Sequence, residues 1–530
     1  MKHHAFSLFC LAILMSLSSP ACANPVVQLP EGSRMEGLSE NGVDSFRGVR
    51  YAQPPVGNLR WRPPVEYRAN SQELVQAHSF GSGCTQPDSP SRYTKIIGSE
   101  DCLFLNVWRP SGVSSDKKLP VMVFIYGGAY IIGSTSIEYG TDESGKTVYA
   151  YEGANLARDN NVVFVTMNYR VGTFGFLAHS GLSREAGYHG SGNYGFLDQV
   201  EALRWIQRNI GAFGGDPGKV MIYGTSAGGS SVSSLVASPL AKGLFSRAII
   251  QSSDGPVMSL EKSEENGVKL SKATECDIAG DEVACLRAKS TEEIANAVSV
   301  SVESGSRGVT YGPTIDHYFL PKSRLELLAS PEHNDVPTVV LVAREEFSWV
   351  IYPFFPNLYA DPLKTDDQYH TLLRTTFGEA IGDGLFSMYP SSQYRSPQHA
   401  FEMIFADLVY NCAARQLARA LVSSQKSPVW RTVYSYVFEN EESARYRGAH
   451  GFSDLLIFRN NLKPPSAKEQ AFAKEIGKIW ADFADTGVFG TPSFPSYESA
   501  KDNYVSIDSP IQMESGFRTE QCDIIDQWGL

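Results

Sequence analysis

The sequence predicts an α/β fold, with one large, mostly parallel sheet covered by helices on both faces. Two observations carry this prediction: short apolar runs rich in β-branched residues recur along the chain, and they alternate with segments of helical periodicity. Hydrophobic residues make up 42% of the 530 residues, which is enough for a large core. No internal repeat or linker divides the chain, so we expect a single domain over residues 24–530.

The individual elements follow from the same periodicity. Apolar runs typical of buried strands lie at 120–126, 162–167, 220–223, 247–251 and 337–342. A helix is expected over about 195–210, because apolar residues recur there at helical spacing, at Leu197, Val200, Leu203 and Ile206. A further helix, made of small residues, is expected to begin near Gly228.

The first 23 residues have the pattern of a cleavable export signal. Lys2 precedes an apolar run from Ala5 to Leu17, and Ala21-Cys22-Ala23 offers a cleavage site. The run is too short to span a bilayer, and no other stretch is longer, so we expect no stable membrane anchor. The sequence therefore predicts a secreted or periplasmic protein, and the absence of Asn-x-Ser/Thr sequons favours a bacterial source.

Charge and cysteine content narrow the classes of partner. A formal charge of −12 disfavours nucleic acid and anionic membrane surfaces. Removal of the signal leaves six cysteines, and for an exported chain these indicate disulfides, since no CxxC spacing suggests a metal site. Fifteen connectivities are possible, of which the simplest joins Cys84 to Cys102, Cys276 to Cys285 and Cys412 to Cys522.

A candidate nucleophile lies in the one GxSxG pattern, Gly224-Thr-Ser-Ala-Gly228. It follows a predicted strand and precedes a predicted helix, the setting in which a sharp turn exposes the serine oxygen of Ser226. Gly127-Gly128-Ala129 follows another strand and can present free N–H groups to an oxyanion, although a plain glycine-rich turn would have the same sequence.

From about residue 30 to the C-terminus, the sequence resembles the type-B carboxylesterase and cholinesterase family. The stretch 213–228 is similar to the active-serine signature of that family, and 100–110 is similar to its second signature, which contains a disulfide cysteine. Shorter matches lie at 46–55, 168–172, 312–316 and 480–487.

This resemblance implies an α/β-hydrolase fold, hydrolysis of small-molecule carboxylic esters through an acyl-enzyme, and no cofactor or metal. It implies Ser226 as nucleophile, His450 in Gly448-Ala-His-Gly451 as base, and Glu346 in Arg344-Glu-Glu-Phe347 as acid, with Glu345 as the alternative. The implied oxyanion donors are the N–H groups of Gly128, Ala129 and Ala227, and the implied disulfides agree with the three pairs above. Asp454 is interpreted as a local hydrogen-bonding partner, and Arg47 with Glu100 as a buried ion pair.

Departures from the family bear on the substrate. Cholinesterases have a tryptophan between the first two disulfide cysteines and a glutamate before the nucleophile, whereas this chain has only Tyr93 as an aromatic there and Thr225. Choline esters are therefore disfavoured. Ala129 replaces a glycine and narrows the acyl side. The long segment 134–152, with its tyrosines, is predicted to form a rim that selects the alcohol, the alternative being a plain surface insertion.

Two other functions fit parts of the sequence. A lipase or sterol esterase would need a lid, but the loop between Cys84 and Cys102 is polar, with Gln86, Asp88, Ser89, Ser91, Arg92, Thr94 and Lys95. A non-catalytic binding protein of this family would typically lack the serine, which is present here. Neither the natural ester nor the oligomeric state is indicated by the sequence.

Overall fold

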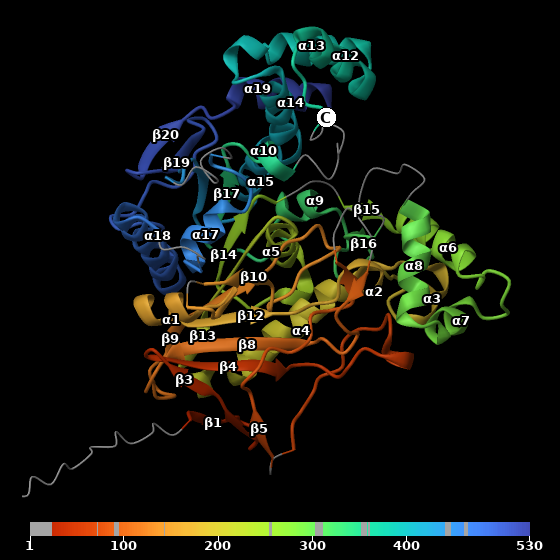
Figure 1. Ribbon diagram of the computed structural model, residues 1–530, viewed down its shortest axis with the longest axis vertical. Coiled ribbons are helices and arrows are strands. Elements are labelled where there is room, and N and C mark those ends of the chain that lie inside the picture. The colour runs from red at the N-terminus through yellow and green to blue at the C-terminus, as the bar shows by residue number, and fades with distance from the viewer. Residues whose placement is uncertain are drawn as a thin grey trace, which may run out of the picture.

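The computed structural model describes residues 24–70, 73–88, 95–142, 144–253, 257–302, 311–350, 358, 361–439, 447–460 and 465–529. The expected export signal, residues 1–23, lies outside these ranges, as do Tyr93 and, of the polar residues named in the loop between Cys84 and Cys102, Ser89, Ser91, Arg92 and Thr94. An eleven-stranded sheet runs through the described protein (Figure 1). Its strands, in spatial order, are β20 (Gln512–Ser515), β19 (Asn503–Ile507), β18 (Val429–Tyr434), β17 (Thr338–Ala343), β14 (Arg247–Gln251), β13 (Gly215–Thr225), β9 (Leu119–Ile125), β12 (Val163–Met167), β8 (Phe104–Pro110), β4 (Val43–Arg50) and β3 (Leu38–Glu40).

The centre of the sheet is parallel and its two edges are antiparallel. Strands β12, β9, β13, β14, β17, β18 and β19 pair in parallel, while β20 at one edge and β8, β4 and β3 at the other run antiparallel to their neighbours. All five expected strands lie in the parallel centre, and β9, β12, β14 and β17 match their predicted bounds closely. Strand β13 begins five residues before its predicted start. The predicted α/β fold is confirmed.

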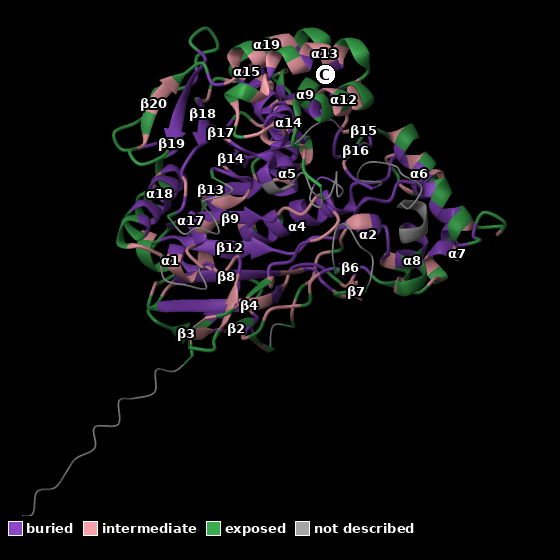
Figure 2. Ribbon diagram, turned by 45° about the horizontal axis from the view of Figure 1, so that its top comes forward, coloured by how far each residue is buried: buried purple, intermediate pink, exposed green. Residues whose placement is uncertain are grey.

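Helices cover both faces of this sheet. On one face α1 (Ala154–Asn160), α17 (Phe452–Phe458) and α18 (Ala467–Thr486) pack together, and α18 rests on β9 and β13. On the other face α4 (Tyr194–Asn209), α5 (Ala227–Ala237), α9 (Arg324–Leu328) and α15 (Cys412–Ser424) form a second layer, with α5 against β13 and β14. In Figure 2 the sheet is buried, as are α4 and α5, whereas α18 has an exposed side. Helix α4 is the one predicted at 195–210.

Two helical groups extend beyond the layers. Helices α12 (Asp366–Phe377), α13 (Glu379–Met388) and α14 (Pro397–Ala406), with α10 (Phe347–Val350), enclose an apolar cluster of their own, at the top of Figure 1. Helices α6 (Leu260–Ala273), α7 (Glu282–Ala288) and α8 (Thr291–Val302) lie at the side with the short α2 (Gly172–Phe176) and α3 (Ser180–Glu185). The minor strands are β1 (Val26–Gln28), β2 (Arg34–Glu36), β5 (Leu74–Gln76), β6 (Gln86–Pro87), β7 (Ile96–Ile97), β10 (Glu138–Thr141), β11 (Thr147–Tyr149), β15 (Met258–Ser259) and β16 (Thr314–Ile315).

Three disulfides join the same cysteine pairs that the sequence favoured. Cys276–Cys285 connects the end of α6 to α7, and Cys412–Cys522 connects α15 to α19 (Thr519–Trp528). Cys84–Cys102 closes the loop that contains β6 and β7. The last of these lies beside the candidate active site and is described with it.

The expected ion pair between Arg47 and Glu100 is wrong. Arg47 bonds Glu152 at 2.6 Å, and its guanidinium stacks on the Phe80 ring. Glu100 accepts two hydrogen bonds from Arg60, at 2.5 and 2.7 Å. Such a bidentate pair satisfies both carboxylate oxygens at once, which explains why the nearly buried Arg60 takes this position.

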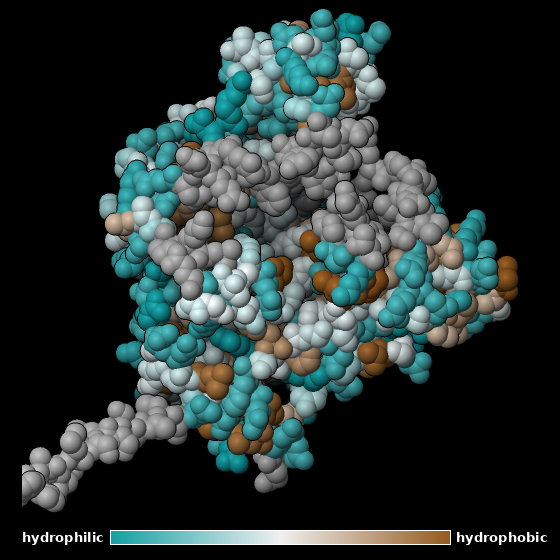
Figure 3. Space-filling model, in the orientation of Figure 1, coloured by the Kyte–Doolittle hydropathy of each residue, from teal (hydrophilic) through white to brown (hydrophobic). Residues whose placement is uncertain are grey.

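Two further observations concern the distribution of apolar residues over the surface and along the helices. On the face seen in Figure 3, apolar side chains gather only in small, separate groups. Within the described ranges, no helix combines the length and the apolar character needed to cross a bilayer.

Candidate active site

Ser226 occupies the junction between β13 and α5, in the middle of the sheet. Its φ of +63° lies in the left-handed region, which is strained for a residue with a Cβ atom. The turn is held because the Ser226 N–H donates to the carbonyl of Gln251, at 3.0 Å, on the neighbouring strand β14. The turn lies at the carboxyl end of β13, in the strand–turn–helix setting that the GxSxG pattern predicted.

The loop after β9 approaches this serine closely. A Cβ atom on Gly127 would lie 2.5 Å from the Thr225 carbonyl oxygen and 2.9 Å from the Ser226 Cβ, so only glycine fits. Gly128 and Ala129 have φ of +114° and +56°, and within the described chain their N–H groups have no hydrogen-bond partner. Two backbone donors, together with the N–H of Ala227 at the start of α5, are therefore available beside Ser226.

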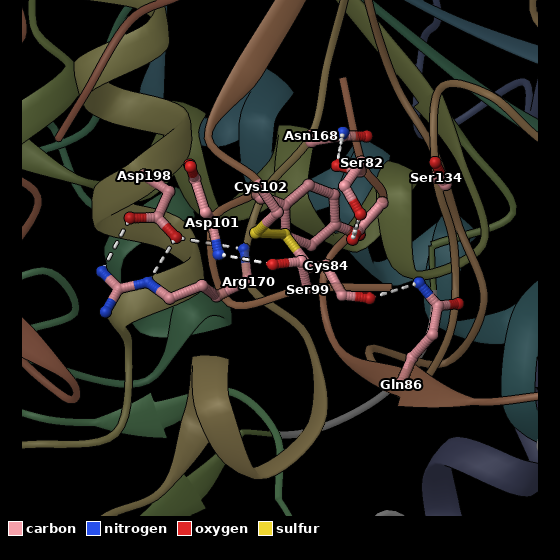
Figure 4. The surroundings of a disulfide bond; sticks show 12 residues. Ser82, Cys84, Gln86, Ser99, Asp101, Cys102, Ser134, Asn168, Arg170 and Asp198 are labelled. Carbon is pink, nitrogen blue, oxygen red and sulfur yellow. Dashed lines mark hydrogen bonds and ion pairs between the residues drawn. A yellow bond between two sulfur atoms is a disulfide. The ribbon is translucent and has the colours of Figure 1, made fainter. Parts of the chain in front are cut away.

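The disulfide loop supports this backbone turn from behind. The Gln86 amide bonds both the N–H and the carbonyl of Gly133, at 2.7 and 2.8 Å, and also the Cys84 carbonyl. Figure 4 shows Gln86 beside the Cys84–Cys102 bridge, directed toward the Cys84 carbonyl. Gln86 is buried, although the sequence counted it among the polar residues of a surface loop.

Glu346 and His450 form a direct buried pair. The Glu346 Oε2 atom lies 2.5 Å from the His450 Nδ1 atom. The other carboxylate oxygen accepts hydrogen bonds from the Ser252 hydroxyl, at 2.7 Å, and from the Ala343 N–H, at 2.6 Å. Because Glu346 is fully buried and both of its carboxylate oxygens are hydrogen-bonded, its orientation toward the imidazole is fixed.

The neighbouring Glu345 has different partners. Its carboxylate accepts two hydrogen bonds from Arg395, at 2.8 and 2.6 Å, contacts His399 at 3.2 Å, and lies 3.4 Å from Arg447. Burial acts to raise the pKa of Glu345, but hydrogen bonds from His399 and Arg395 outweigh it and lower the pKa to about 2. Of the two candidate acids, only Glu346 is in contact with His450.

Asp454 contacts the residue that precedes the candidate nucleophile. Its Oδ1 atom accepts from the Thr225 hydroxyl at 2.9 Å and from the Gln251 amide at 3.1 Å. Burial raises the pKa of this carboxyl to about 6. Its partners are thus 229 and 203 residues away in the chain, whereas the sequence suggested a local role.

The segment 134–152 forms a hairpin of β10 and β11 that is anchored to the sheet layers. The Tyr151 ring packs against Phe124 and Phe458, with ring centroids 4.8 and 5.5 Å apart. Tyr139 is 45% exposed, and burial and the Asp454 charge raise its pKa to about 12. Through Tyr151, the segment packs against Phe458 of α17, the helix that also carries Asp454.

Sequence reasoning missed three residues that organise the site. Gln251 is the last residue of β14 and Ser252 follows it, and their side chains reach Asp454 and Glu346 respectively. Gln86 holds the donor loop. Their position at the carboxyl end of a parallel strand was the available signal for Gln251 and Ser252, because such ends meet at one edge of a sheet. No cluster of metal-ligating side chains occurs in the described ranges.

Comparison with known proteins places the chain among esterases. A model of the Carboxylesterase family matches residues 23–525. A fumonisin B1 esterase of Sphingopyxis macrogoltabida is 33% identical, over 89% of this chain and 85% of its own length. A cocaine esterase of Oryctolagus cuniculus is 32% identical, over 84% of both chains, and a para-nitrobenzyl esterase of Bacillus subtilis is 30% identical, over 92% and 96%.

Proposed function

Since the chain belongs to the carboxylesterase family and is a carboxylic ester hydrolase, we propose that it acts through Ser226, His450 and Glu346 and forms a covalent acyl-enzyme. The observation that carries this proposal is the buried bond of 2.5 Å between His450 and Glu346. The strained turn of Ser226 is linked to this pair through β14, because Gln251 accepts from the Ser226 N–H and the next residue, Ser252, donates to Glu346. An imidazole whose Nδ1 is held by a carboxylate presents Nε2 as the base, which is the arrangement that a serine nucleophile needs.

In the first half-reaction, the Ser226 Oγ attacks the ester carbonyl while the His450 Nε2 takes the hydroxyl proton. The tetrahedral oxyanion accepts hydrogen bonds from the N–H groups of Gly128, Ala129 and Ala227. The intermediate collapses as His450 returns the proton to the leaving alcohol, which gives the acyl-enzyme. Glu346 keeps the imidazole in the required tautomer and stabilises its positive form.

In the second half-reaction, water replaces the alcohol. His450 removes a proton from this water as it attacks the acyl carbonyl, and the same three N–H groups hold the second oxyanion. Collapse of this intermediate breaks the bond to the Ser226 oxygen, His450 returns the proton to that oxygen, and the carboxylic acid leaves.

For the substrate, we favour small, soluble esters other than choline esters. The relatives are named for unlike compounds, so the family alone does not fix the ester. The β10–β11 hairpin, through Tyr139, lies near the site on the Asp454 side and is proposed as the rim that selects the alcohol. A panel of esters that varies acid and alcohol separately tests this: Tyr139→Ala should change relative rates among alcohols, and equal relative rates contradict it.

A lipase that opens a lid between Cys84 and Cys102 is the alternative. The burial of Gln86 and its two bonds to Gly133 favour a fixed segment at this end of the loop. The same panel separates the two functions, because a lipase would prefer long-chain esters in micelles over dissolved butyrates.

We also propose that residues 24–530 form one domain and that the chain is exported. A single sheet takes strands from Leu38 to Ser515, and three disulfides are typical of an oxidising compartment. N-terminal sequencing of the protein from periplasm and medium should begin at Asn24, and retention of residues 1–23 contradicts the proposal.

The test of the mechanism is Ser226→Ala, assayed with p-nitrophenyl butyrate. Loss of the nucleophile should lower kcat by about 10⁴-fold or more, because the other groups alone cannot form the acyl-enzyme. Labelling of the unaltered protein, but not of the variant, by an organophosphonate probe is the matching control. Near-normal turnover by the variant overturns the proposed function.

A further inference from the structure

The carboxylate of Asp454 is buried beside the nucleophile without a permanent cation. Asp454 lies in the first turn of α17, four residues after His450, and is 9% exposed. Its hydrogen-bond donors are both neutral: the Thr225 hydroxyl at 2.9 Å and the Gln251 amide at 3.1 Å. A charge in such a place loses the solvation of water, and neutral donors replace only part of it.

The groups that interact with Asp454 come from several parts of the fold. The negative charge of Asp454 contributes to raising the pKa of four tyrosines from different parts of the fold, namely Tyr139, Tyr151, Tyr223 and Tyr434. Among the described groups that act on Asp454, the one that favours its ionised form by charge is His450. Within the described ranges no Lys or Arg side chain forms an ion pair with Asp454, whereas Arg170 pairs with Asp198 and Arg415 with Asp502.

We propose that Asp454 is a second carboxylate of the active site, a positioning residue whose charge stabilises the imidazolium form of His450 during acyl transfer. This inference rests on the proposed function, in which His450 becomes positive each time it accepts the proton of Ser226 or of water. In the resting enzyme Asp454 faces a neutral imidazole, and in the transition state it faces a cation.

The charge of Asp454 therefore stabilises the transition state more than the resting enzyme, which is the condition for lowering the activation barrier. Glu346 contacts the imidazole directly, whereas Asp454 acts through space and through the turn that carries Ser226. Its Thr225 bond also links α17 to the residue before the nucleophile. Charges that are fixed before the reaction, in a site without water, cost no reorganisation when the opposite charge develops.

The variant that tests this is Asp454→Asn, which keeps the shape and removes the charge. We expect kcat to fall by about 10- to 100-fold at pH 8, with KM nearly unchanged, because the lost interaction exists only in the transition state. The acid limb of the kcat/KM profile should also move to lower pH, since the imidazolium loses a stabilising neighbour. Asp454→Glu, which restores the charge, should recover much of the rate and return the limb toward its original pH.

A matched control is Tyr223→Phe. The Tyr223 hydroxyl is buried near Asp454 and makes no hydrogen bond in the described protein, so its removal disturbs the same region without changing a charge. We expect unchanged kcat and an unchanged acid limb. Should the amide variant fail to fold, Asp454→Ser removes the charge with a smaller side chain, and the same movement of the limb is expected.

Two outcomes overturn the inference. One is a folded, charge-free variant with the kcat and acid limb of the parent. The other is a slower variant whose acid limb has not moved, which identifies Asp454 as a structural hydrogen-bond acceptor only. Failure of the proposed function is recognised separately, because Ser226→Ala would then retain turnover whatever Asp454→Asn does.

Discussion

Two regions flank the Glu346–His450 pair, and each contains a buried carboxylate. Behind the turn that follows β17, Glu345 is surrounded by Arg395, His399 and Arg447. On the other flank, Asp454 accepts hydrogen bonds only from neutral groups in the described protein. The environments move their pKa values in opposite directions, to about 2 for Glu345 and to about 6 for Asp454.

The ionised form of Glu345 therefore stabilises the fold, whereas the ionised form of Asp454 lowers its stability. Glu345 gains from its cations more than burial costs, so its ionised form stabilises the folded protein. Asp454 has no such compensation, and its ionised form is retained at a cost in stability. Strained or uncompensated groups are concentrated at functional sites. We therefore expect the Glu345 region to contribute to stability, and our proposal assigns Asp454 to the active site.

The comparison depends first on Glu346 being the carboxylate that serves His450. Glu346→Gln should lower kcat by about 10³- to 10⁴-fold, because an amide neither stabilises the imidazolium nor fixes the same tautomer. Turnover of p-nitrophenyl butyrate at pH 8 measures the effect. Activity close to that of the unaltered protein would mean that another acid, such as Glu345, replaces it, and the distinction between the two regions would fail.

The sequence predicted what depends on local pattern. The parallel strands and helix α4 follow from short-range periodicity, and Ser226 follows from a five-residue motif in a strand–turn–helix setting. The resemblance to the family supplied His450 and Glu346 as candidates. These assignments needed no knowledge of which distant segments meet.

The rest depends on contacts between distant parts of the chain. Asp454 was interpreted as a local partner because the sequence shows only which residues are close along the chain. Its partners in the structure, Thr225 and Gln251, belong to the distant strands β13 and β14. Arg47 and Glu100 were paired on the resemblance to the family, and each has another partner in the structure. The sequence shows which residues carry charges, but it does not show which acidic side chains have a basic partner in the folded protein.

The Glu345 region can be tested through stability. Glu345→Gln leaves Arg395 and Arg447 without their shared carboxylate, so we expect the free energy of unfolding at pH 7 to fall by roughly 2 kcal/mol. Because the folded-state pKa of about 2 lies below the ordinary value of 4.5, this contribution is complete above that value and is lost as the pH falls toward 2. Urea unfolding at pH 7 and at pH 3 should show a large and a small difference, respectively.

The control for this measurement is Arg68→Gln, which removes an exposed charge pair with Glu66 far from the site and should change stability little. The Glu345 variant should retain far more activity than Glu346→Gln. Equal losses of activity in both would show that the Glu345 region takes part directly in catalysis.

The smallest effect is expected from Asp454→Asn, now measured as stability. The folded-state pKa of Asp454, about 6, lies above the ordinary value of 3.8, so its carboxyl stabilises the fold fully below that value and loses this contribution as the pH rises through 6. An amide does not ionise, and at pH 8 the variant should therefore be more stable by roughly 1 kcal/mol, with the gain shrinking toward pH 4. Thermal unfolding at both pH values measures this. A variant that is slower yet more stable at pH 8 is the signature of an uncompensated functional charge, whereas a variant less stable at pH 8 would place Asp454 with Glu345, among the charges that hold the fold together.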